Sequence, residues 1–256
     1  MDTYLPGWDG SSQDDSAPAR ARLAFLLAGV AAGLGGAYMF LVFLSMHHPI
    51  PAFRQFVNDS RWDHVLGGPL VFANMLAAML LIGCRPDNLW KARSLLLLAV
   101  SAAALGFWCV EHAHYFGWNQ PVHRRSDDPF TVLCLRSISL VRIATLVDLA
   151  AVIAAVPGAR DSARLRRTAV RAAVLAFVLW LILAVTHIDW GQQPLQWRNF
   201  RDPVSYGLLV GSIIARAISA ALAAILCGLA FAVSHRQAKE RRAQECSLLG
   251  EHRDWP

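Results

Sequence analysis

The sequence predicts an all-α fold: a polytopic integral membrane bundle of six transmembrane helices, with both termini in the cytoplasm. Hydrophobic residues make up 55% of the 256 residues and charged residues only 16%, whereas about a quarter of the residues in soluble domains are charged. Six apolar runs have roughly the 20 residues that a helix needs to span a bilayer. Lysine and arginine also concentrate on one side of these runs. Together these observations favour a membrane protein over a soluble one.

The predicted spans follow one another closely, so one transmembrane domain accounts for residues 21–235. In chain order the spans cover residues 21–46, 65–84, 94–115, 131–156, 168–187 and 205–234. The first run is longer than the ~7 to 15 apolar residues of a secretory signal and follows a polar lead, which predicts a retained helix. Residues 1–20 and the basic residues 236–256 are expected to form polar cytoplasmic tails.

Glycine and proline predict where helices end and where they approach each other. The stretches HPIP at residues 48–51 and GGP at residues 67–69 are expected at helix ends, because both residue types interrupt helices. Residues 29–33 and 32–36 each begin and end with a small residue four positions apart. This spacing predicts close contact between the first span and a neighbouring helix.

The distribution of positive charge sets the predicted orientation, because lysine and arginine resist translocation. The segments on the side of the termini hold Arg20, Arg22, Arg85, Lys91, Arg93, Arg160, Arg164, Arg166, Arg167, Arg171, Arg236, Lys239, Arg241, Arg242 and Arg253. The opposite segments hold only Arg54, Arg61, Arg124, Arg125, Arg198 and Arg201. The termini are therefore expected in the cytoplasm. Topology explains the formal charge of +6, and no nucleic-acid partner is expected.

This threading gathers most histidines on the outer side of the predicted bundle. Those residues are His47, His48, His64, His112, His114, His123 and His187. Tyrosine, tryptophan and histidine settle at the headgroup level without any further role, so an aromatic belt accounts for a single histidine there. A belt does not account for Glu111, about one turn inside the third span, because a carboxylate at that depth needs protein, water or an ion beside it.

A second set of charges is predicted deeper in the bilayer. The fourth span carries Arg136, Arg142 and Asp148, and the sixth carries Arg216. Arg142 and Arg216 lie about eleven residues from the outer ends of their spans, or ~16 Å, close to the bilayer middle. Asp148 can form a structural ion pair that joins the two helices. Alternatively, the excess positive charge receives a bound anion, a carboxylate-bearing ligand or a lipid headgroup.

The first functional hypothesis is a membrane redox subunit with a b-type haem or a copper-like ion near the outer face. Neutral imidazoles bind such centres, and nearby carboxylates orient them. The candidate ligands and supporting residues are His47, His48, His112, His114, His187, Glu111 and Asp189. No HExxH motif, glycine-rich phosphate loop or internal repeat identifies a reaction, so whether the protein is an enzyme stays open.

Two other hypotheses use the same architecture. A small-solute or proton-coupled transporter would use the intramembrane residues Arg136, Arg142, Asp148 and Arg216. A non-catalytic accessory subunit would present its small-residue faces to larger partners. In each case the expected partners are the lipid bilayer and either other membrane subunits or further copies of the chain. The expected location is a bacterial inner membrane.

Overall fold

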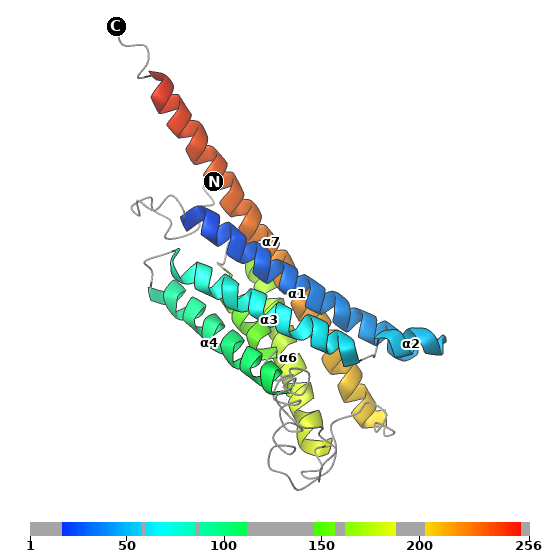
Figure 1. Ribbon diagram of the computed structural model, residues 1–256. Coiled ribbons are helices and arrows are strands. Elements are labelled where there is room, and N and C mark those ends of the chain that lie inside the picture. The colour runs from blue at the N-terminus through cyan, green and yellow to red at the C-terminus, as the bar shows by residue number, and fades with distance from the viewer. Residues whose placement is uncertain are drawn as a thin grey trace.

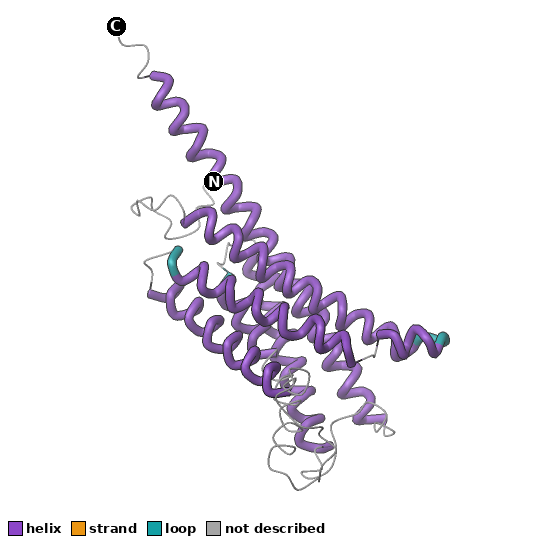
Figure 2. The backbone as a smooth tube through the Cα atoms, in the orientation of Figure 1, coloured by secondary structure: helices purple, strands orange, loops and turns teal. Residues whose placement is uncertain are grey.

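The computed structural model describes residues 17–57, 60–84, 88–111, 146–156, 162–187 and 203–251. All regular elements within these residues are helices (Figure 2), and residues 48–50 form a short loop between two of them. Three helices are long and apolar enough to cross a membrane by length and composition, over Ala19–Met46, Asn88–Cys109 and Pro203–Glu240. The predicted all-α class is therefore confirmed for these residues, and the apolar helices are consistent with a membrane protein.

The helices are α1 (Ala17–His47), α2 (Pro51–Val57), α3 (Ser60–Ile82), α4 (Asn88–Glu111), α6 (Ala163–His187) and α7 (Pro203–Glu251). A further apolar helix, Leu146–Ala155, covers the inner part of the fourth predicted span. Residues 131–145 of that span lie outside the described residues. Each of the six predicted runs thus contains helical chain in the described residues.

The prediction that residues 67–69 mark a helix end is wrong, because Pro69 lies inside α3. Nine residues of helix, about two and a half turns, precede the proline, and the run of apolar residues after it continues the same helix. Gly67 and Gly68 instead allow a close approach between helices. A Cβ atom added at Gly68 would lie 2.8 Å from the indole ring of Trp108 in α4.

Some helices that pack together in the bundle are far apart in the sequence (Figure 1). α1 lies along α7, which also packs against α6, and α3 contacts both α1 and α4. α1 and α7 run in opposite directions, as do α3 and α4, so the ends of these helices gather at two ends of one bundle (Figure 1).

The predicted small-residue contact of the first span is confirmed and involves α7. A Cβ atom added at Gly29 would lie 3.1 Å from the Cβ atom of Cys227, and one added at Gly36 would lie 3.1 Å from that of Ala220. Without side chains at these positions, the two helix backbones approach closely. Dispersion contacts between the backbones then stabilise the pair, as they do between helices in lipid.

Small residues also fill the interior, whereas large apolar side chains face outward. Alanine is the commonest buried residue, and the exposed large residues of α1 and α6 include Leu23, Leu26, Val30, Leu34, Val174, Leu175, Val178 and Leu181. A soluble bundle would bury such side chains, because water penalises exposed apolar surface. This arrangement matches a bundle surrounded by lipid.

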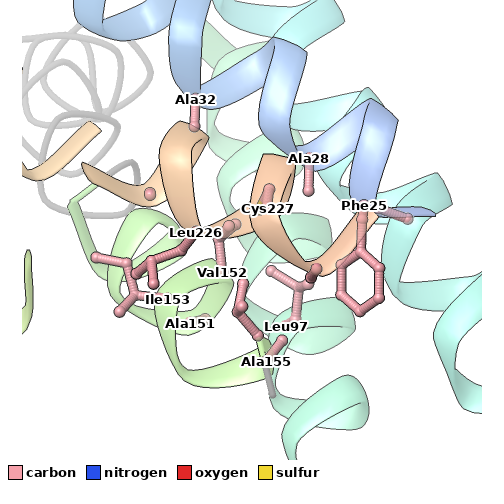
Figure 3. Close-up of a cluster of buried hydrophobic side chains, with 14 of the residues drawn as sticks. Phe25, Ala28, Ala32, Leu97, Ala151, Val152, Ile153, Ala155, Leu226 and Cys227 are labelled. Carbon is pink, nitrogen blue, oxygen red and sulfur yellow. The ribbon is translucent and has the colours of Figure 1, made fainter. Parts of the chain in front are cut away.

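The Leu146–Ala155 helix lies at the centre of the main core. Figure 3 shows residues of this helix beside α1, α4 and α7: Ala151, Val152, Ile153 and Ala155 with Phe25, Ala28, Ala32, Leu97, Leu226 and Cys227. Val147 on this helix is 38% exposed, whereas Asp148 is 3% exposed, so the carboxyl group of Asp148 is held away from the surface.

Candidate functional site

The most deeply buried Asp, Glu, His, Lys or Arg side chain described in the structure is that of Asp148, on the central helix. Asn74 of α3 donates a hydrogen bond from Nδ2 to Oδ2 of Asp148 over 2.6 Å. Ser101 of α4 donates from Oγ to Oδ1 over 2.5 Å. The carboxyl group of Asp148 is thus held between three helices, and we call these three residues the Asp148 cluster.

Helix periodicity places each member of the cluster in the interior. In α4, Ser101 shares one buried stripe with Ser94, Leu97 and Ala104, which lie at the i+3, i+4 and i+7 spacing of a helix face. In α3, Asn74 precedes the buried residues Ala77, Ala78 and Leu81 at the same spacing. The apolar members of both stripes pack the helices together, and this packing fixes the two polar side chains opposite Asp148.

Burial makes the electrostatics of the cluster unusual. Asp148 is 3% exposed, Asn74 8% and Ser101 0%. Both hydrogen-bond partners are neutral, and within the described residues Asp148 forms no ion pair. An ionised carboxylate without a cation is expensive in such surroundings. The chemistry of the cluster therefore suits a positively charged partner, either a proton or a small cation.

Asn74 has a second polar atom that the cluster leaves unused. Its Oδ1 atom is buried and has no hydrogen-bond partner among the described residues. Buried polar atoms are nearly always paired, so an unpaired carbonyl oxygen indicates a donor or cation that arrives in another state. This oxygen belongs to the same amide group that holds Asp148.

The hydrogen bonds of Asp148 differ from the structural ion pair that is one of the two alternatives left open by the sequence. Its partners are Asn74 and Ser101, and Arg216 of α7 is half-buried elsewhere in the bundle with no bond to Asp148 within the described residues. Arg136 and Arg142 lie outside the described residues. Sequence analysis identifies Asp148 as a candidate but misses Ser101, although its place on the buried seven-residue stripe of α4 is a usable signal.

The predicted outer histidine site lies mostly outside the described part of the chain. This applies to His112, His114 and Asp189 entirely, and to the side chains of His47, Glu111 and His187, which are the last residues of α1, α4 and α6. These three helices end at the same end of the bundle (Figure 1). The backbone therefore permits the predicted gathering, and convergence of the rings stays a prediction.

His48 is the one predicted ligand whose side chain the structure describes. Its Nδ1 atom accepts a hydrogen bond from the backbone N–H of Ile50 over 3.2 Å. The imidazole also packs on Phe53, with 4.6 Å between ring centroids. One ring nitrogen is thus occupied in shaping the turn between α1 and α2. Among the described residues there is no group of three His, Cys, Asp or Glu side chains that could hold a metal ion.

A separate group of positive residues gathers at the opposite end of the bundle, which we call the basic end. Here Arg22 Nη1 of α1 lies 3.4 Å from His235 Nδ1 of α7, and Arg166 Nη2 of α6 donates to the carbonyl oxygen of Ala154 over 3.3 Å. Partial burial, and secondly the nearby guanidinium of Arg93, lower the pKa of Arg166. Residues from α1, α4, α6 and α7 are therefore neighbours at this end.

Comparison with known proteins adds no relative: no family model, curated protein or solved structure matches the chain. The Asp148 cluster and the arrangement of the helices are therefore the features that indicate function.

Proposed function

We propose that the protein is a proton- or cation-coupled membrane carrier in which Asp148 is the ion-binding carboxyl group. The burial of Asp148 between two neutral donors is the observation that carries this proposal. Ionisable residues inside membrane bundles are costly and mark ion paths and proton relays. A purely structural contact between these helices would need no acid, because apolar side chains of similar volume pack as well without the cost of burying a charge.

The proposed topology has six spans and places both termini in the cytoplasm. Contacts at the basic end support it, because Cys84 at the end of α3 donates from Sγ to the carbonyl oxygen of Ala17, over 3.4 Å, at the start of α1. Arg93 and Arg166 lie close together at the same end. Chain segments that six alternating spans would place in the cytoplasm are therefore neighbours, and they carry most of the positive charge.

The test is proton movement in proteoliposomes that contain the purified full-length protein. Internal pH is followed under an imposed membrane potential, first alone and then with amino acids, organic acids, sugars and divalent metal ions added in turn. We expect at least one condition to move protons with the wild-type protein and not with Asp148→Asn. Ser219→Ala is the matched control, since it removes a buried hydroxyl that donates to Ala169 outside the cluster.

Two results would contradict the proposed function. In the first, no condition moves protons or cations with the wild-type protein. In the second, folded Asp148→Asn protein moves them as fast as the wild type. A lost signal in Asp148→Asn counts only if this variant elutes as a single species in detergent and unfolds cooperatively, as the Ser219→Ala control should.

The haem or copper-like centre near the outer face stays a separate prediction from the sequence. Its ligands would come from His47, His112, His114 and His187, with Glu111 in support. An absorption spectrum and metal analysis of the purified protein test it, and the absence of both a Soret band and stoichiometric metal would remove it. The proposed location remains a bacterial inner membrane, in contact with lipid and with other membrane subunits or further copies of the chain.

A further inference from the structure

We propose that the ion bound at Asp148 is a proton, and that the side-chain amide of Asn74 turns over as this proton arrives and leaves. This inference depends on the proposed function, because it identifies the ion that the proposed carrier binds. It gives a role to the Oδ1 atom of Asn74, which is buried and has no hydrogen-bond partner among the described residues.

The number of hydrogen-bond donors and acceptors in the Asp148 cluster indicates that the bound ion is a proton. The donors are the Ser101 hydroxyl and the Asn74 amide, and both point at the carboxyl group of Asp148. Two deficits remain in the ionised cluster: a buried negative charge and the acceptor Oδ1 of Asn74 without a donor. One proton on Asp148 removes the charge and, once the amide has turned, supplies Oδ1 with a donor; Nδ2 then takes the buried place that Oδ1 left.

The amide group of Asn74 can serve both states of Asp148. In the arrangement described here, Nδ2 donates to Oδ2 of Asp148 over 2.6 Å, which suits an ionised carboxylate. When a proton binds to Oδ2, the N–H···Oδ2 bond breaks and the new O–H group needs an acceptor. A half-turn of the amide about its Cβ–Cγ bond brings Oδ1 to the place of Nδ2, because the two ends of the amide are nearly equal in shape.

The rest of the cluster is unchanged in this exchange. Ser101 continues to donate to Oδ1 of Asp148, which keeps the carboxyl group oriented in both states. Release of the proton reverses the step and restores the Nδ2 bond. No oxidant, reductant or other reactant is needed, since one proton enters, one hydrogen bond breaks and another forms.

A metal cation fits the described residues less well than a proton. The cluster offers side-chain oxygens from Asp148, Asn74 and Ser101 only, whereas hard cations such as Ca²⁺ and Mg²⁺ take roughly six or more oxygen ligands. Backbone carbonyls inside α3 and α4 are used by the helices themselves. A proton needs one acceptor on each side and no coordination shell.

The neighbouring elements offer few competing charges. The side chains described for α3, from residue 66 to residue 82, include no Asp, Glu, His, Lys or Arg, and residues 146–156 include only Asp148. In α4 the charged residues are Lys91, Arg93 and Glu111, each at least about 12 Å along the helix from Ser101. Arg216 of α7 has no bond to Asp148 within the described residues. Among the described residues, the protonation of Asp148 therefore depends on its burial and on its two hydrogen-bond partners.

Infrared difference spectroscopy on the full-length protein in lipid tests this directly. We expect the carbonyl-stretch band of a buried carboxylic acid in the wild type, lost in Asp148→Asn and retained in Ser219→Ala. Titration to higher pH should remove the band and change the amide carbonyl band of Asn74 together with it. In Asn74→Leu the acid band should move to higher frequency, because the protonated acid loses its acceptor.

The contradicting results are equally specific. The proposal would be overturned if the wild-type spectrum contains no acid band that Asp148→Asn removes. It would also be overturned if the acid band has the same frequency in Asn74→Leu as in the wild type. A second arm needs only the wild-type protein and compares sodium chloride with choline chloride at equal ionic strength. Stabilisation by sodium, together with loss of the acid band, would identify a metal cation instead.

These results can be told apart from failure of the proposed function. If sodium replaces the acid band while Asp148→Asn still abolishes transport, the carrier proposal stands and the proton assignment fails. If the acid band behaves as expected while Asp148→Asn transports normally, the protonation site stands and the carrier proposal fails.

Discussion

At the scale of single residues, the decisive feature is that two described side chains hold the carboxyl group of Asp148. Ser101 and Asn74 each donate one hydrogen bond to Asp148. Both side chains are buried, and Ser101 is fully buried, so water does not replace either donor. Loss of one donor therefore leaves a buried acceptor unpaired. An unpaired buried group costs more than an average hydrogen bond contributes.

Removal of the Ser101 hydroxyl should destabilise the protein more than removal of the Ser219 hydroxyl. Ser101→Ala leaves Oδ1 of Asp148 without a donor, at a cost of about 1–3 kcal/mol. Ser219 donates to the carbonyl oxygen of Ala169 inside α6, which keeps its helical partner, so Ser219→Ala should cost about 0.6 kcal/mol, the average for such bonds in membrane proteins. Thermal unfolding in detergent measures both variants, and equal losses would contradict the expected difference.

The sequence predicts part of this site and misses part of it. Asp148 stands out because an acid in an apolar run is costly in lipid, and Asn74 stands out as a polar side chain in the second run. Ser101 does not, since serine occurs in four of the six predicted runs and only packing shows which one meets the acid. Whether Asp148 also faces an arginine depends on helix rotation as well as on depth, and Arg136 and Arg142 lie outside the described residues.

At the scale of helices, α1 and α7 meet through residues without bulk. Gly29 and Gly36 of α1 lie against Cys227 and Ala220 of α7, and packing of this kind replaces the hydrophobic effect, which does not drive association between helices in lipid. Side-chain volume added on this face should therefore separate the two helices, whereas volume added elsewhere on α7 should not.

A matched pair of glycine substitutions tests the α1–α7 contact. In Gly36→Leu the new Cβ atom would lie 3.1 Å from the Cβ atom of Ala220, and such overpacking costs about 1–3 kcal/mol. Gly228 has no heavy atom within 4 Å of its own added Cβ, so Gly228→Leu should be neutral or stabilise α7 by up to about 1 kcal/mol through helix propensity. Unfolding in detergent compares the two variants, and a stable Gly36→Leu protein would refute the close contact.

Helix boundaries follow the sequence where hydropathy changes and depart from it where packing decides. The predicted first and fifth runs lie inside α1 and α6, whose ends add a few polar residues. The charged stretch at residues 234–245 predicts a solvated extension of the last helix, and α7 continues to Glu251, because a charged helix can extend beyond the membrane surface. For the same reason α7 reaches about 70 Å, more than twice the ~30 Å hydrocarbon thickness, and projects beyond the bundle (Figure 1).

At the scale of the whole molecule, charge and direction agree. The basic end joins α1, α3, α6 and α7 through contacts that involve Ala17, Arg22, Cys84 and His235, together with the neighbouring Arg166. The opposite end holds α2 and the exposed residue Ile50. Under the positive-inside rule, the proposed topology places the basic end in the cytoplasm.

Cysteine labelling in whole cells tests this orientation. In a variant whose native cysteines are replaced, Ile50→Cys should react with a membrane-impermeant maleimide added outside. Lys239→Cys, at the basic end, should react only after the membrane is opened. Both positions are exposed in the structure, so accessibility does not depend on the fold opening. Reaction at position 239 in intact cells would reverse the proposed topology.

The central claim is that Asp148 binds the ion that the protein moves, and ion movement in proteoliposomes tests it most directly when Asp148→Asn and Asp148→Glu are compared. The glutamate keeps an acid in the cluster, so we predict that Asp148→Glu retains measurable movement while Asp148→Asn, which has nearly the same shape as the wild-type residue, retains none. Movement at the wild-type rate in folded Asp148→Asn protein would contradict the claim.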